Sequence, residues 1–282
     1  MMILVTGVNG FIGKALFKSL KIIGEPMGIY NTSDKIFENT YKIDLLKEEE
    51  VFKFSENEFA QKIDTIVHLS SRTVNGQSSD DISIIAESAQ LSKNLALLCK
   101  KTNIKYLINI SSSSVYSNTD GTYNENSSTQ PASNSDCFYG VSKLNSEIIF
   151  DHTLSSSNIM ITHLRVCMVL GDNIDKTRLI PVLENEIVNS NTVTLFGNGE
   201  RIINTISIER LVEYINFFIK NPSPGVFNVA EESISVLELS KRLIAKKGNK
   251  ETKIILKEQG NKSKFILETK KLHMLLKKIG HV

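Results

Sequence analysis

Three glycines, at positions 7, 10 and 13, stand between a short apolar run at 3–5 and a segment with apolar residues about every four positions. This pattern predicts a strand, a tight turn and a helix. Gly7 permits the turn, Gly10 lets the backbone approach a pyrophosphate, and Gly13 lets the helix pack on the strand. The unpaired N–H groups of the helix terminus favour phosphate. We therefore predict a dinucleotide-binding turn made by Gly7, Asn9, Gly10, Phe11, Ile12 and Gly13.

Short apolar runs and helical patterns then alternate along the chain. The runs lie at 27–30, 64–69, 106–110, 160–164 and 226–229, and the helical patterns at 83–101, 138–154 and 209–219. Such alternation is typical of parallel β-α-β units. The predicted fold class is α/β, a Rossmann-type doubly wound parallel sheet with a small α/β C-terminal substrate lobe.

The predicted domain division follows the change of rhythm after about residue 165. Residues 1–165 form the dinucleotide-binding domain, which also takes back about 200–230, and residues 166–199 and 231–282 form the substrate-binding lobe. In the lobe we expect helices at 179–188 and 235–246, an amphipathic stretch at 269–279, and a hairpin from Val193 through the turn 197–199 to Ile206.

Composition excludes several partners. The 33 Lys and Arg residues against 31 Asp and Glu give a net charge of +2 without a basic stripe, which disfavours nucleic acid. The chain has no apolar run of about 20 residues, so we expect no membrane span and a cytoplasmic protein. The three cysteines form no CxxC pair, so we expect no metal site and no disulfide framework.

The end of the second strand discriminates between cofactors, because a carboxylate there binds the ribose of NAD and repels the extra phosphate of NADP. Here the strand leads to Asn31, Asp34 comes three residues later, and Lys35 is close enough to assist a 2′-phosphate. NADP is therefore slightly favoured over NAD. Asp44, with Leu45 beside it, either contacts the adenine of the cofactor or is a solvated carboxylate in a loop. Leu69 and Ser70, which follow the run at 64–69, complete the expected cofactor site.

Tyr139 and Lys143 lie four residues apart at the start of a predicted helix, so both project from one face. The run Ser111 to Ser114 ends the strand before that helix, at the sheet edge where ligands of open parallel sheets bind. A nearby cation stabilises the phenolate of a tyrosine, whose ordinary pKa is about 10. A serine hydroxyl can orient a substrate alcohol beside it.

These motifs together resemble the extended short-chain dehydrogenase/reductases, in the nucleotide-sugar branch of the NAD-dependent epimerase/dehydratase family. The resemblance rests on the turn at 6–13, the strand 67–69, the run 111–116 and Tyr139-Gly140-Val141-Ser142-Lys143, followed by 164–165, 195–200, 227–230 and 235–239. It implies that Ser112 is the catalytic serine, with Ser113 as a less favoured substitute, that Tyr139 is the acid/base, and that Lys143 is its partner and a cofactor ligand. It also implies a homodimer formed through the helices at 83–101 and 138–154.

Departures from the family pattern narrow the reaction. Dehydratases of this branch carry an Asp-Glu pair after the catalytic hydroxyl, whereas this chain has Ser113 and Ser114, so we do not expect 4,6-dehydration. Ser113 is therefore a candidate substrate-binding residue. Arg72 faces the substrate or lies on the surface. The usual diphosphate-binding arginine is replaced by Ile203.

Two further arginines are candidates for the substrate diphosphate, because a planar guanidinium can bind two phosphate oxygens. Arg201 lies two residues before Ile203 and either substitutes for the usual arginine or faces solvent. Arg178 is the other candidate.

The predicted function is an NAD(P)-dependent oxidoreductase acting at C4 of a nucleotide-linked hexose, as a 4-epimerase or a 4-keto reductase, with polysaccharide precursor synthesis as the expected role. Two alternatives remain: a reductase of a non-nucleotide carbonyl compound, and a catalytically silent dinucleotide-sensing protein.

Overall fold

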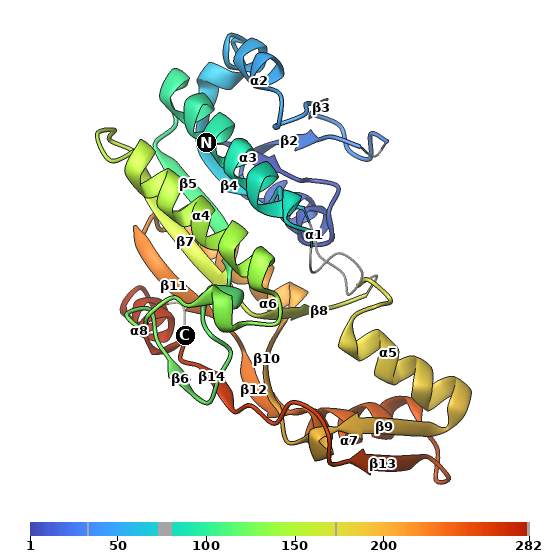
Figure 1. Ribbon diagram of the computed structural model, residues 1–282. Coiled ribbons are helices and arrows are strands. Elements are labelled where there is room, and N and C mark those ends of the chain that lie inside the picture. Colours follow the sequence, from blue (N-terminus) through green and yellow to red (C-terminus); the bar gives the residue numbers. More distant parts are fainter. Residues whose placement is uncertain (33, 73–80, 173, 281–282) are drawn as a thin grey trace.

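The computed structural model describes residues 1–32, 34–72, 81–172 and 174–280. Within these residues the largest sheet has seven strands, in the order β11-β7-β5-β4-β1-β2-β3, and all neighbouring strands are parallel (Figure 1). The strands are β1 (Met2–Thr6), β2 (Glu25–Tyr30), β3 (Thr40–Lys42), β4 (Ile63–His68), β5 (Tyr106–Ser112), β7 (Met160–Val166) and β11 (Gly225–Val229). This order confirms the predicted Rossmann-type doubly wound sheet.

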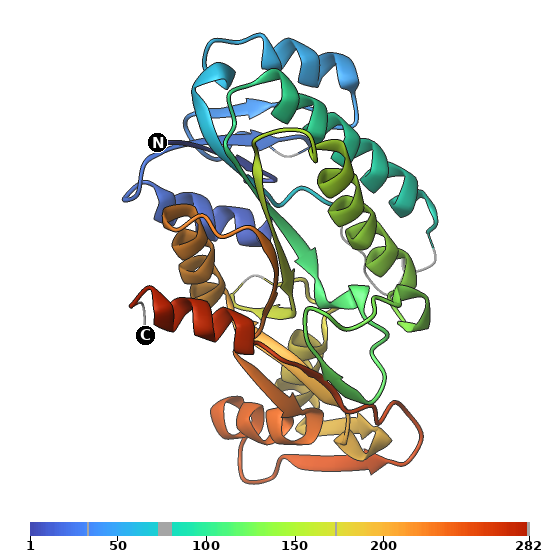
Figure 2. The same cartoon turned by 90° about the vertical axis from the view of Figure 1, so that its left-hand side faces the viewer.

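Helices cover both faces of this sheet (Figure 2). One face carries α1 (Phe11–Leu20) and α6 (Ile208–Lys220), and the other carries α3 (Ser83–Lys101) and α4 (Cys137–Thr153), with α2 (Glu48–Ser55) against α3. Successive side chains of a strand point to opposite faces. Ile3 and Val5 therefore join the core under α1 and α6, whereas Leu4 joins the core under α3 and α4. Because helices cover both faces, the central strands β1, β5 and β7 are largely buried, and polar side chains within them, such as Asn109 and Arg165, are hydrogen-bonded.

The direction of winding reverses between β1 and β4, which are neighbours in the sheet. Loops that leave the carboxyl ends of strands diverge at such a point and open a crevice for ligands. The glycine turn follows β1 and the serine run ends β5, so the fold brings both motifs to the same edge of the sheet.

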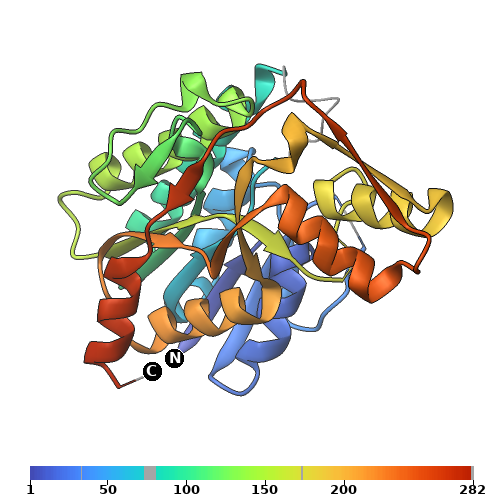
Figure 3. The ribbon, with the colours of Figure 1, turned by 90° about the horizontal axis from the view of Figure 1, so that it is seen from below.

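The lobe has a core of its own beyond this edge. Its elements are β8 (Met168–Leu170), α5 (Leu179–Asn185), β9 (Thr192–Phe196), β10 (Ile202–Ser207), β12 (Glu232–Ser235), α7 (Val236–Lys247) and β13 (Lys253–Lys257). α5 and α7 pack against each other, as the view from below shows (Figure 3). Leu183 of α5, Leu195 of β9 and Leu239 of α7 are buried together.

The predicted hairpin between residues 193 and 206 is wrong. β9 pairs in parallel with β13, from Thr192 opposite Lys253 onwards, whereas β10 pairs with β8 and β12. Gly197, at φ 59°, donates its N–H to the carbonyl of Gln259 at 2.8 Å. The turn therefore connects two different small sheets. β9 and β10 each pair with other strands and not with each other.

The C-terminal segment returns to the large core. β14 (Phe265–Leu267) pairs in parallel with β6 (Gly121–Tyr123), and α8 (Lys270–Lys278) packs on β11, where Leu272 and Leu276 are fully buried. The predicted domain boundaries remain a prediction, but residues 265–278 pack on the core of the large sheet and not on that of the lobe. Among the described helices, none has the length and apolarity needed to cross a membrane.

Candidate active site

A cleft of about 1280 Å³ lies at the carboxyl edge of the large sheet, between the sheet and the lobe. Apart from Lys35, which is considered below, the residues predicted from the sequence to be catalytic, cofactor-binding or substrate-binding line this cleft. They are Gly7, Asn9, Gly10, Phe11, Ile12, Gly13, Asn31, Asp44, Leu45, Leu69, Ser70, Arg72, Ser112, Ser113, Tyr139, Lys143, Arg178 and Arg201. The fold thus brings them together, and their individual roles are considered below.

The glycine turn has the geometry of a phosphate cradle. Gly7 has φ 69°, and its N–H donates to the carbonyl of Ile29 at 2.9 Å. A Cβ at Gly13 would lie 2.2 Å from the carbonyl oxygen of Gly7, so only glycine permits this approach of α1 to β1. No side chain caps α1 at Gly10. The first N–H groups of the helix are therefore presented to the cleft, which suits the pyrophosphate of a dinucleotide.

A buried hydrogen-bond cluster holds the segment after β4 against this turn. The Thr6 hydroxyl lies 2.8 Å from His68 Nδ1 and accepts the N–H groups of Leu69 and Ser70, each at 3.2 Å. Burial, together with the charge of Lys143, lowers the pKa of His68 to about 3. His68 is therefore neutral, and its Nδ1 accepts the Thr6 proton. This cluster positions Leu69 and Ser70 at the cofactor side of the cleft.

Asn31 and Asp44, predicted to meet the adenosine part of the cofactor, line one cleft with the glycine turn. Asp44 accepts the N–H of Leu46 at 3.0 Å, so its carboxylate is partly used to order the loop after β3. Lys35, expected to assist a 2′-phosphate, instead forms an exposed ion pair with Glu38 at 3.3 Å and is not among the residues lining the cleft. The structure thus gives no support to that part of the argument for NADP.

The three predicted catalytic residues meet in the middle of the cleft. Tyr139 and Ser112 line the same cleft, and the Ser112 side chain lies close enough to Tyr139 to lower the pKa of its phenol. Ser112 Oγ also accepts the N–H of Ser114 at 3.1 Å, which fixes the hydroxyl at the end of β5. Lys143 Nζ donates to the carbonyl of Ile110 at 3.0 Å and lies 5.6 Å from the centre of the Tyr139 ring.

Burial shifts both titrating groups toward their neutral forms. It raises the pKa of Tyr139, and this is opposed by the charge of Arg178 and by the nearby Ser112 hydroxyl. Burial also lowers the pKa of Lys143 to about 8. A phenol and an amine with these opposed shifts are typical of a proton-transfer site.

Close approach of α4 to the serine run brings Tyr139 to Ser112. A Cβ at Gly140 would lie 2.2 Å from the carbonyl oxygen of Ser114, so the first turn of α4 can touch this loop only with glycine at that position. Ser113 follows Ser112 in the cleft wall and is half-buried. Neither Ser113 nor Ser114 supplies an acidic group.

The three candidate arginines differ in their surroundings. Arg72 pairs with Asp81 at 2.7 Å and with Glu87 at 3.2 Å, so acidic residues near the start of α3 hold it at the rim of the cleft. Arg178 immediately precedes α5 and its charge acts on Tyr139. Arg201, which the sequence left between cleft and solvent, lines the cleft and is half-buried. Within the described part of the chain, its Nε has no hydrogen-bond partner.

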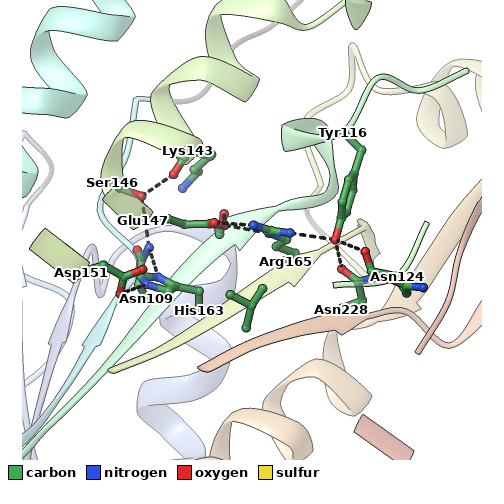
Figure 4. Close-up of polar contacts among 12 residues, drawn as sticks. Asn109, Tyr116, Asn124, Lys143, Ser146, Glu147, Asp151, His163, Arg165 and Asn228 are labelled. Carbon is green, nitrogen blue, oxygen red and sulfur yellow. Dashed lines mark hydrogen bonds and ion pairs between the residues drawn. The ribbon is translucent and has the colours of Figure 1, made fainter. Parts of the chain in front are cut away.

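A buried polar network that the sequence did not predict lies directly behind the predicted catalytic residues. Glu147 on α4 accepts hydrogen bonds from Arg165 Nε at 3.0 Å and Nη2 at 2.7 Å (Figure 4). It also accepts the Ser111 hydroxyl at 2.5 Å. Glu147 lies four residues after Lys143, so the helical spacing that related Lys143 to Tyr139 could have indicated it. Its partners Ser111 and Arg165 lie on β5 and β7, far from Glu147 in the sequence, so local spacing could not identify them.

Comparison with known proteins identifies the family. A sequence model of the NAD dependent epimerase/dehydratase family matches residues 3–230. The chain therefore belongs to the NAD-dependent epimerase/dehydratase family.

Individual relatives share the fold at low identity. The chain is 26% identical over 273 residues to the dTDP-D-glucose 4,6-dehydratase of Dictyostelium discoideum, a match that covers 86% of this chain and 61% of the relative. It thus spans about three fifths of that curated relative's length.

Two solved structures of Bacillus cereus proteins are similar in fold. The UDP-N-acetylglucosamine 4-epimerase is 23% identical, with coverage of 98% of this chain and 90% of that chain and a TM-score of 0.81. The UDP-glucuronic acid 4-epimerase in complex with UDP-glucuronic acid and NAD is 24% identical, with coverage of 98% and 93% and a TM-score of 0.81. The dinucleotide in that complex is NAD, so the predicted preference for NADP gains no support from it.

Proposed function

We propose that this protein is an NAD(P)-dependent oxidoreductase that acts at C4 of a nucleotide-linked hexose, as a 4-epimerase or a 4-keto reductase. The observation that carries the proposal is the presence of Ser112, Tyr139 and Lys143 together in the cleft that also contains the glycine cradle, with Lys143 Nζ 5.6 Å from the centre of the Tyr139 ring. Family membership supports a nucleotide-sugar reaction that depends on a dinucleotide.

Each catalytic side chain has a role that its surroundings support. The Ser112 hydroxyl, fixed by the N–H of Ser114, donates a hydrogen bond to the sugar O4. Tyr139 removes the proton from O4 during oxidation and returns it during reduction. Protonated Lys143 stabilises the Tyr139 phenolate, since a nearby cation favours the charged form of the phenol. The bound dinucleotide supplies the hydride acceptor and donor for C4.

We propose NAD as the dinucleotide. Gly7, Gly10 and Gly13 form a cradle for its pyrophosphate, with the N-terminus of α1 directed at the phosphates. Asn31 faces the adenosine ribose, and Lys35, the cation that would favour a 2′-phosphate, pairs instead with Glu38. Competition between NAD and NADP in an equilibrium binding assay tests this assignment.

The arginines support a nucleotide-linked substrate over a simple ketone. A non-nucleotide reductase would be favoured if neither Arg178 nor Arg201 lined the cleft, and both do. Arg201 lines the cleft and is half-buried, so its guanidinium is a candidate for binding a phosphate oxygen of the substrate. Arg72, held by two carboxylates, contributes less to substrate binding in this proposal.

The residues after Ser112 argue against 4,6-dehydration. Elimination of water from the sugar needs an acid and a base besides the redox site, and Ser113 and Ser114 supply neither. The chain's curated relative is named as a dehydratase, so this difference is a direct prediction about product. We expect a C4 epimer or a C4 alcohol, and no 4-keto-6-deoxy sugar.

The experiment is incubation of the purified chain with NAD, NADH, NADP or NADPH and with UDP-, dTDP-, GDP- and CDP-linked hexoses and 4-keto hexoses. Products are separated by chromatography, and Tyr139→Phe is the control. Interconversion of C4 epimers without net cofactor loss identifies an epimerase, and stoichiometric oxidation of NAD(P)H with a 4-keto sugar identifies a reductase. Dinucleotide binding without turnover of any sugar would contradict the proposal and favour a sensing protein.

We also propose a homodimer through α3 and α4, which pack side by side on one face of the sheet and leave Ile148 of α4 48% exposed. Light scattering of the purified chain, with Ile148→Glu as the variant, tests it. A monomeric wild type would contradict it.

A further inference from the structure

Two hydrogen bonds join helix α4 to successive residues of strand β5: Lys143 Nζ donates to the carbonyl of Ile110 at 3.0 Å, and the Ser111 hydroxyl donates to Glu147 at 2.5 Å. Tyr139 lies one turn before Lys143 and near Ser112, the next residue of the strand. The three helix residues are spaced by four, so they lie on one face. A shift of α4 by a fraction of a turn would break both hydrogen bonds and move Tyr139 relative to Ser112.

Glu147 is the most firmly held member of this set. Its carboxylate, 4% exposed, accepts two N–H groups of the Arg165 guanidinium and the Ser111 hydroxyl. A forked guanidinium–carboxylate pair specifies direction as well as distance. Because Arg165 belongs to β7, the neighbour of β5, the carboxylate is tied to two adjacent strands.

Arg165 in turn connects this pair to strand β11. Its Nη1 donates to the Tyr116 hydroxyl at 2.9 Å, and that hydroxyl lies 2.9 Å from Asn228 Oδ1 (Figure 4). Asn228 Nδ2 donates to the carbonyls of Tyr123 and Glu268, each at 3.1 Å. The network therefore anchors Glu147 to β11, at the edge of the large sheet, and to the chain around β14.

The network acts on the active site through geometry and not through charge. The charge of Glu147 is balanced by that of Arg165. The pKa of Lys143 is lowered by burial, without a contribution from Glu147. Neither Glu147 nor Arg165 lines the cleft, so neither can touch a substrate there. Both side chains are buried. Glu147 is hydrogen-bonded to Ser111, the residue before Ser112, and Arg165 is hydrogen-bonded to Glu147.

We propose that Glu147 and Arg165 are positioning residues that fix the register of α4 on β5 and thereby hold the Tyr139 hydroxyl against Ser112. Ser111 is the link through which the carboxylate acts on the strand. The proposal extends the function proposed above, and only its catalytic readout depends on that function.

The sharpest variant is Ser111→Ala, which removes the link and leaves the Glu147–Arg165 pair intact. Its matched control is Tyr106→Phe, which removes another buried hydroxyl of β5, bonded to Thr162 at 2.7 Å at the far end of the strand. Both variants lose a buried hydrogen bond, so similar losses of thermal stability are expected. Only Ser111→Ala should lower kcat, by about tenfold, since misplacement of reacting groups by about 1 Å can cost up to about 100-fold.

The pH profile separates positioning from a general loss of stability. In the free enzyme the Ser112 side chain lowers the pKa of Tyr139, so displacement of Tyr139 from Ser112 raises that pKa and moves the acidic limb of kcat/KM for sugar oxidation to higher pH. KM for the nucleotide sugar should remain within about twofold, because no substrate contact is removed. In a Ser112→Ala background, Ser111→Ala should cause no further fall in kcat, since the two act through one contact.

A second readout does not require turnover. The chain has seven tyrosines, and the 13Cζ resonance of Tyr139 in tyrosine-labelled protein can be assigned by its loss in Tyr139→Phe. We expect this resonance to move in the same direction in Ser111→Ala, Ser112→Ala and Arg165→Lys, and to stay in place in Tyr106→Phe. Arg165→Lys keeps a cation beside Glu147 while losing the fork.

The outcomes are distinct. If the resonance moves as expected but no nucleotide sugar is converted, the positioning proposal holds and the proposed function fails. A resonance that moves in Ser112→Ala alone, or kcat losses that are equal in Ser111→Ala and Tyr106→Phe, would overturn the proposal, because the network would then support only the general stability of the fold.

Discussion

Replacement of the buried active-site lysine should change the pH dependence of folding stability. Burial lowers the pKa of Lys143 to about 8 from the ordinary value of 10.5. Above pH 8 the folded protein loses this proton, whereas the unfolded chain keeps it until about pH 10.5. The unfolded state then binds more protons, so stability rises with pH across that interval and is lowest, as far as this group is concerned, below pH 8.

The expected magnitude follows from the two pKa values. Between pH 7 and pH 9.5, titration of Lys143 should increase the free energy of unfolding by about 2 kcal/mol. Lys143→Met removes this increase. The variant also loses the hydrogen bond to the Ile110 carbonyl, but that loss is a nearly constant offset, and only the change with pH is compared.

The assay is urea denaturation of wild type and Lys143→Met at pH 7.0 and pH 9.5, followed by circular dichroism. Lys14→Met, at an exposed position of α1, controls for the loss of a lysine as such and should follow the wild type. The wild type should gain about 2 kcal/mol relative to Lys143→Met between the two pH values. Parallel behaviour of these two proteins would refute the reasoning, because Lys143 would then not pay a burial cost for its charge.

Three further predictions concern the cleft. Gly13→Ala places a Cβ 2.2 Å from the Gly7 carbonyl oxygen and should destabilise the protein by about 1–3 kcal/mol and weaken dinucleotide binding, measured by thermal shift and NADH fluorescence titration; unchanged affinity would contradict the cradle. Tyr139→Phe should lower kcat by about 10²–10⁴ with unchanged dinucleotide affinity, and a smaller loss in product assays would mean that another group moves the proton. Arg201→Ala should raise KM for the nucleotide sugar by about 10- to 100-fold at nearly constant kcat, because one charge-assisted contact is lost. Arg72→Ala should change KM little, because the charge of Arg72 is already paired with Asp81. If initial-rate kinetics showed the larger rise in KM for Arg72→Ala, the roles of the two arginines would be exchanged.

The amino-acid sequence by itself determined the sheet and the position of the cofactor cradle. Alternation of apolar runs and amphipathic segments is a local property of the chain, and so is the glycine spacing at 7, 10 and 13. The parallel order of the sheet follows from the right-handed connections between such units. Tyr139 and Lys143, four residues apart, could be placed on one helix face for the same local reason.

Only the tertiary structure decided which side chains complete the site. Arg201 lies in the cleft because β10 pairs with β8 and β12 and not with β9, an outcome that the turn at 197–199 did not reveal. Glu147 meets Arg165 and Ser111 across three elements, over separations that no periodic pattern records. Short-range spacing specifies helix faces and strand faces. Contacts between distant segments depend on which strands pair and on how the elements pack, and these are determined only when the whole chain is folded.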